Sequence, residues 1–118
     1  MAHREIAFAD RGIDIIRTAL LRECHHGDLT GHPAVEIAAV RARCVSEPFP
    51  GGESYADMVR RVREFLSRAR GERIVVVGHG ATLYALRHLL DGAPLSDVVA
   101  AAWQWQPGWR FHVDRLSA

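Results

Sequence analysis

The sequence contains no lysine, so arginine carries all 15 of its basic side-chain charges. Against 14 acidic residues this leaves a formal net charge of only +1. Such a balance excludes the strong positive field of a protein that binds nucleic acid or an anionic membrane through charge alone. Only two cysteines are present, Cys24 and Cys44, and these are too few for a disulfide framework.

Long apolar runs are also missing. No stretch reaches the ~18 residues that a membrane span needs, and the N-terminal Met1-Ala2-His3-Arg4-Glu5 has no apolar signal-peptide core. The apolar fraction of 48% and the charged fraction of 25% are typical of a globular protein. We therefore expect one domain over residues 1–118, soluble and cytoplasmic, with no nucleic acid or membrane as partner.

Helical and extended patterns alternate along the chain. Apolar spacing, capping residues and β-branched runs indicate where the elements lie. Helices are predicted at residues 3–9, from Pro33, from Ser54 to Gly71, at 81–90 and at 97–103, the last capped by Ser96. Strands are predicted at 13–16, 73–77 and 109–114. This order predicts an α/β fold of three αβα layers around a mostly parallel sheet.

The most informative segment is Val75-Val76-Val77-Gly78-His79-Gly80, where a β-branched run stops at a histidine between two glycines. The glycines let the backbone approach an anion closely, and the helix that follows adds free N–H groups at Gly80. An imidazole placed there can stabilise a phosphoryl or carboxyl group or move a proton near neutral pH. The alternative is a histidine that only caps the turn.

A second candidate is Glu23, in a polar loop beside Arg22, His25 and His26. A carboxyl group in such a loop can act as a general acid if its neighbours raise its pKa; the alternative is a surface pair of Arg22 with Glu23. Adjacent histidines in an extended loop point apart, and zinc needs three or four convergent ligands. We therefore predict no metal and no cofactor.

Three segments, in order, make the chain resemble the histidine phosphatase superfamily, which has the phosphoglycerate mutase-like fold. Residues 21–31 (LRECHHGDLTG) resemble the family's L-R-E-x-x-x-G-x-x-x-G segment, residues 49–54 (FPGGES) its F-P-G-G-E-S turn, and residues 77–80 (VGHG) its S-H-G segment. The resemblance implies that Glu23 is the proton donor and that His79 holds the transferred phosphoryl group. The predicted substrate-binding residues are Arg22, His25, His26, Ser54 and Gly80.

The family's R-H-G motif, whose histidine is phosphorylated during the reaction, does not occur in this sequence. Residues 2–9 (AHREIAFA) resemble the end of the family's T-A-E helix, so the resemblance implies an N-terminally truncated member. It lacks the nucleophile and both early phosphate-clamping arginines, and without a nucleophile the family's covalent mechanism loses many orders of magnitude in rate.

The missing strand also implies that residues 73–77 have an unpaired apolar edge in mid-sheet, which invites another chain. We therefore predict a homodimer or a partner chain that covers this edge. Three functions are compatible with the sequence. The first is a repurposed enzyme that performs acid–base chemistry on a small anionic substrate through His79 and Glu23, without a phosphohistidine. The second is a non-catalytic pseudophosphatase that binds or assembles, and the third is a phosphatase completed in trans by a partner chain.

Overall fold

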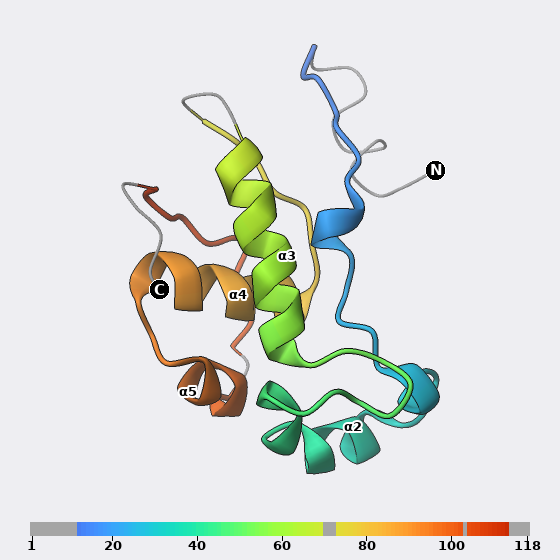
Figure 1. Cartoon of the computed structure of the whole chain (residues 1–118). Helices are drawn as coiled ribbons and strands as arrows, with labels where there is room; N and C mark the ends of the chain where they lie inside the picture. The colour runs from blue at the N-terminus through green and yellow to red at the C-terminus, as the bar shows by residue number, and fades with distance from the viewer. Residues whose placement is uncertain (1–11, 70–72, 103, 114–118) are drawn as a thin grey trace.

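The computed structural model describes residues 12–69, 73–102 and 104–113. In these ranges the order of elements is η1 (Ala19–Leu21), η2 (Gly27–Leu29), α2 (Ala34–Val40), η3 (Arg43–Val45), α3 (Tyr55–Arg68), α4 (Gly80–Asp91) and α5 (Leu95–Ala100). The long helix α3 packs against α4 at the centre of the molecule, with α5 and α2 at one end (Figure 1). The helix predicted at 3–9 lies outside the described residues.

Helix α3 begins where the sequence predicts. The Ser54 hydroxyl accepts a hydrogen bond from the Asp57 N–H at 3.0 Å, and the Asp57 carboxylate accepts one from the Ser54 N–H at 2.9 Å. This reciprocal capping box satisfies two N–H groups that a helix start otherwise leaves unpaired. The inward face of the helix then buries Met58, Val59 and Val62.

Helix α4 confirms the prediction of a helix at 81–90 that stops at Asp91-Gly92. Gly92 follows the helix with φ +76°, in the left-handed region that suits glycine at a helix end. Six of its residues are buried: Ala81, Thr82, Leu83, Ala85, Leu86 and Leu89. Helices α3 and α4 therefore supply most of the apolar core, which Phe49 and Cys44 extend toward the loops.

The two short helices differ more from expectation. Pro33 precedes α2 as its N-cap, close to the predicted helix start. The helix predicted at 97–103 with Ser96 as its cap is wrong in its bounds and its cap, because α5 runs from Leu95 to Ala100 with Pro94 as N-cap. Proline fixes φ near the helical value and has no N–H to leave unpaired, so Pro94 starts the helix before Ser96 is reached.

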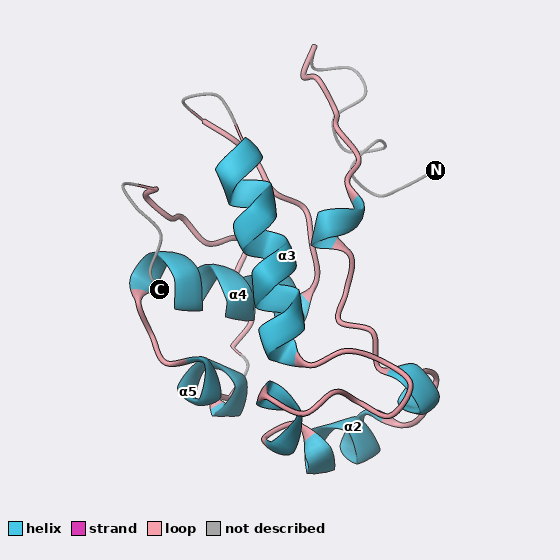
Figure 2. Ribbon diagram, in the orientation of Figure 1, coloured by secondary structure: helices cyan, strands magenta, loops and turns pink. Residues whose placement is uncertain are grey.

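The predicted three-layer αβα fold with a parallel sheet is wrong for the described part of the chain. Residues 13–16, 73–77 and 109–113 form no strand and are drawn as loops in Figure 2. A β-branched run favours an extended backbone, but a strand also needs a neighbour that completes its hydrogen bonds. These segments lack such neighbours in the structure and leave Ile16, Val75 and Val113 exposed.

In the described ranges, no helix combines the length and the hydropathy that crossing a bilayer requires.

The serine cap gives a direct test of how α3 is held. We expect Ser54→Ala to lower the free energy of unfolding by about 1 kcal/mol, because the hydroxyl of a buried N-cap is lost. Ser96→Ala is the matched control: Ser96 is exposed inside α5 and caps nothing, so its effect should stay within about 0.5 kcal/mol. Urea unfolding of both variants measures the difference, and equal effects would contradict the assigned cap.

Candidate functional site

Two loops meet backbone to backbone beside the N-terminal end of α3. The Asp28 N–H donates to the Pro50 carbonyl at 2.8 Å, and the Glu53 N–H donates to the His25 carbonyl at 3.0 Å. A Cβ atom on Gly27 would lie 2.0 Å from the Pro50 oxygen, and one on Gly52 would lie 2.2 Å from the His25 oxygen. Only glycine permits this approach, so the motifs at residues 21–31 and 49–54 form one structural unit.

Arg61 of α3 holds the loop that carries Glu23. Its Nη1 donates to the carbonyl oxygens of Leu20 at 2.9 Å and Arg22 at 3.1 Å, and its Nη2 donates to that of Glu23 at 3.4 Å. The same guanidinium forms an ion pair with Glu53 through Nε and Nη2. The side chains of Arg61 and Glu53 are only 13% and 15% exposed, so this is a largely buried, well-satisfied cluster.

The Glu53 carboxylate is stabilised in its charged form. Burial by itself would raise the pKa of Glu53, but the hydrogen bond from Arg61 and that from the His25 N–H outweigh it and lower the pKa below its ordinary value of 4.5. The His25 N–H lies 3.0 Å from Glu53 Oε1. Glu53 therefore stays ionised near neutral pH and fixes the backbone two residues after Glu23.

A cavity of about 250 Å³ lies between the loop that carries Glu23, helix α2 and the N-terminal ends of α3 and α4. Its lining residues are Glu23, His26, Ala34, Ile37, Arg41, Tyr55, Gly80, Ala81 and Tyr84. The volume is below the roughly 300–1,000 Å³ of sites for drug-sized ligands. The cavity therefore suits a small molecule, and it combines a carboxyl, a guanidinium, an imidazole and the first turn of a helix.

The predicted site residues divide into two groups. The structure brings Glu23, His26 and Gly80 to the cavity, where the N-terminal end of α4 adds the positive end of its dipole. His79 immediately precedes Gly80, but it is exposed and is not among the lining residues; its N–H donates to Thr82 Oγ1 at 3.1 Å.

Three further predicted residues lie elsewhere. Arg22 and His25 are exposed and are not among the lining residues. The Ser54 hydroxyl is buried and engaged in capping α3.

Two arginines of the site were not singled out by the sequence. Arg61 lies in a run of charged residues on α3, three residues after the buried Met58 and four before the half-buried Phe65. Arg41 follows Ile37 by four residues, so both face the same side of α2 and its end. In both cases the helical spacing placed the arginine beside the apolar stripe, and that spacing was the available signal.

Aromatic rings connect the loop to α4 beneath the cavity. His26, Phe49, Tyr55 and Tyr84 follow one another in edge-to-face contacts, with centroid separations of 4.9, 5.7 and 5.7 Å. Such pairs stabilise a core beyond the area they bury. They fix the positions of His26 and Tyr55, both of which line the cavity.

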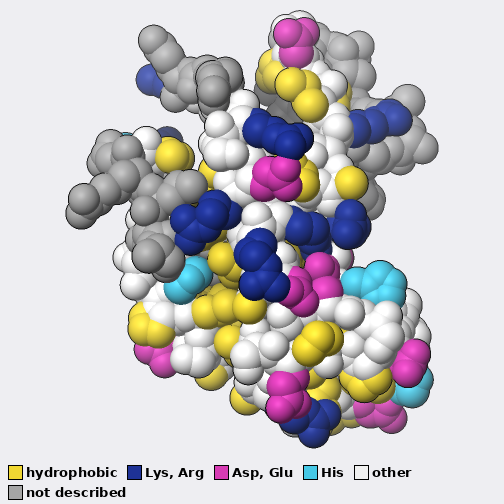
Figure 3. Space-filling view, in the orientation of Figure 1, with side chains coloured by type: hydrophobic (Ala, Val, Ile, Leu, Met, Phe, Trp, Pro, Cys, Tyr) yellow, Lys and Arg dark blue, Asp and Glu magenta, His cyan; other side chains and the backbone are white. Residues whose placement is uncertain are grey.

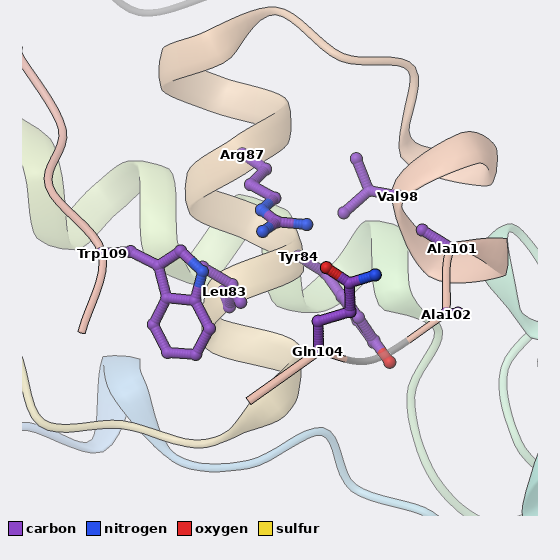
Figure 4. Close-up of a pocket in the computed structure, with 8 residues that line it drawn as sticks. All are labelled: Leu83, Tyr84, Arg87, Val98, Ala101, Ala102, Gln104 and Trp109. Atoms are coloured by element: carbon purple, nitrogen blue, oxygen red, sulfur yellow. The ribbon is translucent and has the colours of Figure 1, made fainter. Parts of the chain in front are cut away.

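A second cavity of about 80 Å³ lies on the other side of Tyr84, between α4, α5 and the segment after α5 (Figure 4). Arg87 and Gln104 extend into it, and Trp109 lies along one side. Its volume admits only a few water molecules. In the described ranges, no group of three or more His, Cys, Asp or Glu side chains is arranged to hold a metal ion.

The comparisons with known proteins identify the family. The sequence model of the histidine phosphatase superfamily (branch 1) matches residues 3–107, so the chain belongs to this superfamily.

Related proteins include two 2,3-bisphosphoglycerate-dependent phosphoglycerate mutases. That of Methylobacterium sp. (strain 4-46) is 41% identical over 86 residues, which cover 61% of this chain and 41% of the relative. That of Rhizobium etli (strain ATCC 51251 / DSM 11541 / JCM 21823 / NBRC 15573 / CFN 42) is 31% identical over 102 residues, which cover 75% and 49%. The chain therefore spans less than half the length of these relatives. No solved structure matches it.

The Arg61 cluster predicts a large and pH-dependent loss of stability. We expect Arg61→Ala to lower the free energy of unfolding by about 2–4 kcal/mol at pH 7, because it leaves Glu53 and three carbonyl groups without their donor. The lowered pKa of Glu53 stabilises the fold above its ordinary value of 4.5 and ceases to do so as the pH falls through the folded-state value. The deficit of the variant should therefore shrink on acidification below about pH 4.5.

Arg60→Ala is the control, because Arg60 is 71% exposed and pairs with Asp57 at the surface. Its cost should stay below about 1 kcal/mol. Denaturant unfolding between pH 7 and pH 3 measures both variants; equal losses, or an Arg61 deficit that grows toward acid pH, would overturn the assignment.

Proposed function

We propose that this chain is a histidine-phosphatase-derived enzyme that performs acid–base chemistry on a small anionic substrate without a phosphohistidine intermediate. The observation that carries the proposal is that Glu23 and the first turn of α4, which follows His79, border one cavity. The substrate class is a small phosphorylated, carboxylated or carbonyl-containing molecule. The cavity volume and the Arg41 guanidinium in its lining support this class.

In this proposal Glu23 transfers the proton. Glu23 lines the cavity. Its carboxyl accepts a hydrogen bond from the Cys24 N–H at 2.9 Å and its backbone carbonyl accepts one from Arg61, so both ends of the residue are held. The N–H groups at the start of α4 and the His79 imidazole stabilise negative charge on the substrate as the proton moves. His26, held by its ring contact with Phe49, lies within the same cavity and orients the substrate.

The test uses a panel of small phosphomonoesters and carboxylates with the full chain. We expect Glu23→Gln and His79→Ala each to lower kcat/KM by about 100-fold or more, the usual worth of a positioned acid or base. His32→Ala is the control, because His32 is exposed and pairs with Glu36 outside the cavity. Turnover that survives Glu23→Gln would refute the proposal, and no turnover on any substrate would favour a non-catalytic binding module.

A second candidate function is a phosphatase or phosphoglycerate mutase activity completed by another polypeptide. Two observations favour it: the chain spans less than half of its relatives, and its extended segments expose apolar side chains. The exposed fractions are 83% for Ile16, 71% for Val75 and 58% for Val113. We infer that a second copy or a partner chain covers these segments by adding strands to them.

Light scattering after size exclusion tests this second candidate. We expect the chain to elute as a dimer, or as a complex when the partner polypeptide is present, and Val75→Asp to dissociate it because a charge then faces the added strand. Val35→Asp is the matched control, since Val35 is 74% exposed on α2, away from the extended segments. A monomer at every concentration and with every candidate partner would contradict the inference.

A further inference from the structure

The smaller cavity, of about 80 Å³, shares only Tyr84 with the lining of the candidate site. Arg87 of α4 and Gln104 extend into it with their polar ends (Figure 4). None of the three family-like segments of the sequence contributes to its lining. Much of the remaining wall is apolar and includes Leu83, Val98 and the ring of Trp109. The cavity therefore combines one cation and one amide with an apolar surface.

Arg87 is placed at this cavity by the end of α4. Its carbonyl accepts a hydrogen bond from the Gly92 N–H that follows the helix and one from the Ala93 N–H at 3.4 Å. Its side chain is half-buried. The guanidinium is therefore carried into the cavity by a backbone that the helix and the turn after it both hold.

The Arg87 guanidinium forms no ion pair with a carboxylate in the part of the chain that the structure describes. Asp91, which lies one helical turn further on, is exposed and does not pair with it. The residues that line the cavity include no acidic side chain. A half-buried cation in such a wall favours an anion as its partner, because water alone compensates its charge poorly there.

The lining favours a carboxylate as that anion. The planar guanidinium matches the two oxygens of a carboxylate, and the Gln104 amide can donate a further hydrogen bond. A phosphate group carries more charge and more acceptor oxygens than these two side chains can satisfy. The volume of about 80 Å³ is that of a few water molecules, which suits a carboxylate with a short alkyl group.

We propose that this second cavity is a binding site for a short-chain carboxylate. Arg87 holds the carboxylate oxygens, with Gln104 as a second donor, and the alkyl group lies against Leu83, Val98 and Trp109. The site shares no charged residue with the cavity that contains Glu23. This inference is therefore independent of the proposed function.

The experiment is a titration of the full chain with sodium propionate at constant ionic strength. It follows the indole N–H resonance of Trp109 by ¹⁵N-edited NMR, and the Trp109→Phe variant, which lacks that signal, identifies it. We expect a saturable shift. Acetate should bind about three- to fourfold more weakly, because one buried methylene is lost. Propionamide, which has the same shape but no charge, should bind at least about tenfold more weakly.

Two positions in the lining test the polar contacts. We expect Arg87→Gln to weaken propionate binding by about tenfold or more, and Arg87→Lys to weaken it by a smaller factor, since lysine keeps the charge but not the planar fork. Gln104→Glu should abolish binding, because its own carboxylate then competes for Arg87. The matched control is Arg110→Gln: Arg110 is exposed, adjoins Trp109 and does not line the cavity, so this variant should bind as the parent chain does.

Four results would each overturn the proposal: a parent chain that shows no saturable shift with propionate, an Arg87→Gln variant that binds like the parent, an equal loss in Arg110→Gln, or inorganic phosphate that binds this cavity more tightly than propionate. Circular dichroism checks that each variant keeps its helices. If Arg87→Gln does not fold, the exposed position 104 decides: a Gln104→Glu variant that binds propionate like the parent overturns the proposal, and one that has lost binding supports it.

Discussion

The ion pair between Arg61 and Glu53 is the interaction on which the candidate site depends. One guanidinium joins helix α3 to the carbonyl oxygens of Leu20, Arg22 and Glu23. It also binds the Glu53 carboxylate, which accepts the His25 N–H. A lysine could not make these contacts together, because an ammonium is a compact donor without the planar fork. Lysine at position 61 would therefore lose several of these hydrogen bonds.

The close contacts at two glycines explain how the loops come near enough for Arg61 and Glu53 to hold them together. Gly27 and Gly52 let the two loops lie against each other closely enough for backbone hydrogen bonds. Phe49 and Tyr55 then continue the contact into the core between α3 and α4. The cavity is thus bordered by elements that are fixed from both sides, as a binding site requires if its geometry is to persist.

Charged side chains of both signs lie side by side on the surface of the described residues. On the face shown in Figure 3, basic and acidic side chains alternate over the central helix and do not gather into one broad patch. Most of the arginines with assigned partners are neutralised locally by a carboxylate one helical turn away. At the cavity wall the Arg41 guanidinium and Glu23 lie among the same lining residues.

Local sequence signals determined the start of α3 and the extent of α4. The Ser54 and Asp57 pair, the stripe of Met58 and Val62, and Gly92 placed α3 and α4 correctly, because caps and helical spacing act over a few residues. The family motifs likewise placed Glu23, His26 and Gly80 near one another. The sheet was not predictable in this way, since the runs at 13–16 and 73–77 specify only an extended backbone and pairing requires a neighbouring strand.

Tertiary structure alone decided the roles of the arginines. Arg41, Arg60 and Arg61 are alike in the sequence, yet one lines a cavity, one lies on the surface and one is buried in a hydrogen-bonded cluster. What distinguishes them is which distant carbonyls and carboxylates the fold brings within hydrogen-bond distance. That depends on how the loops at 22–28 and 49–53 meet, a contact between segments that no local pattern encodes.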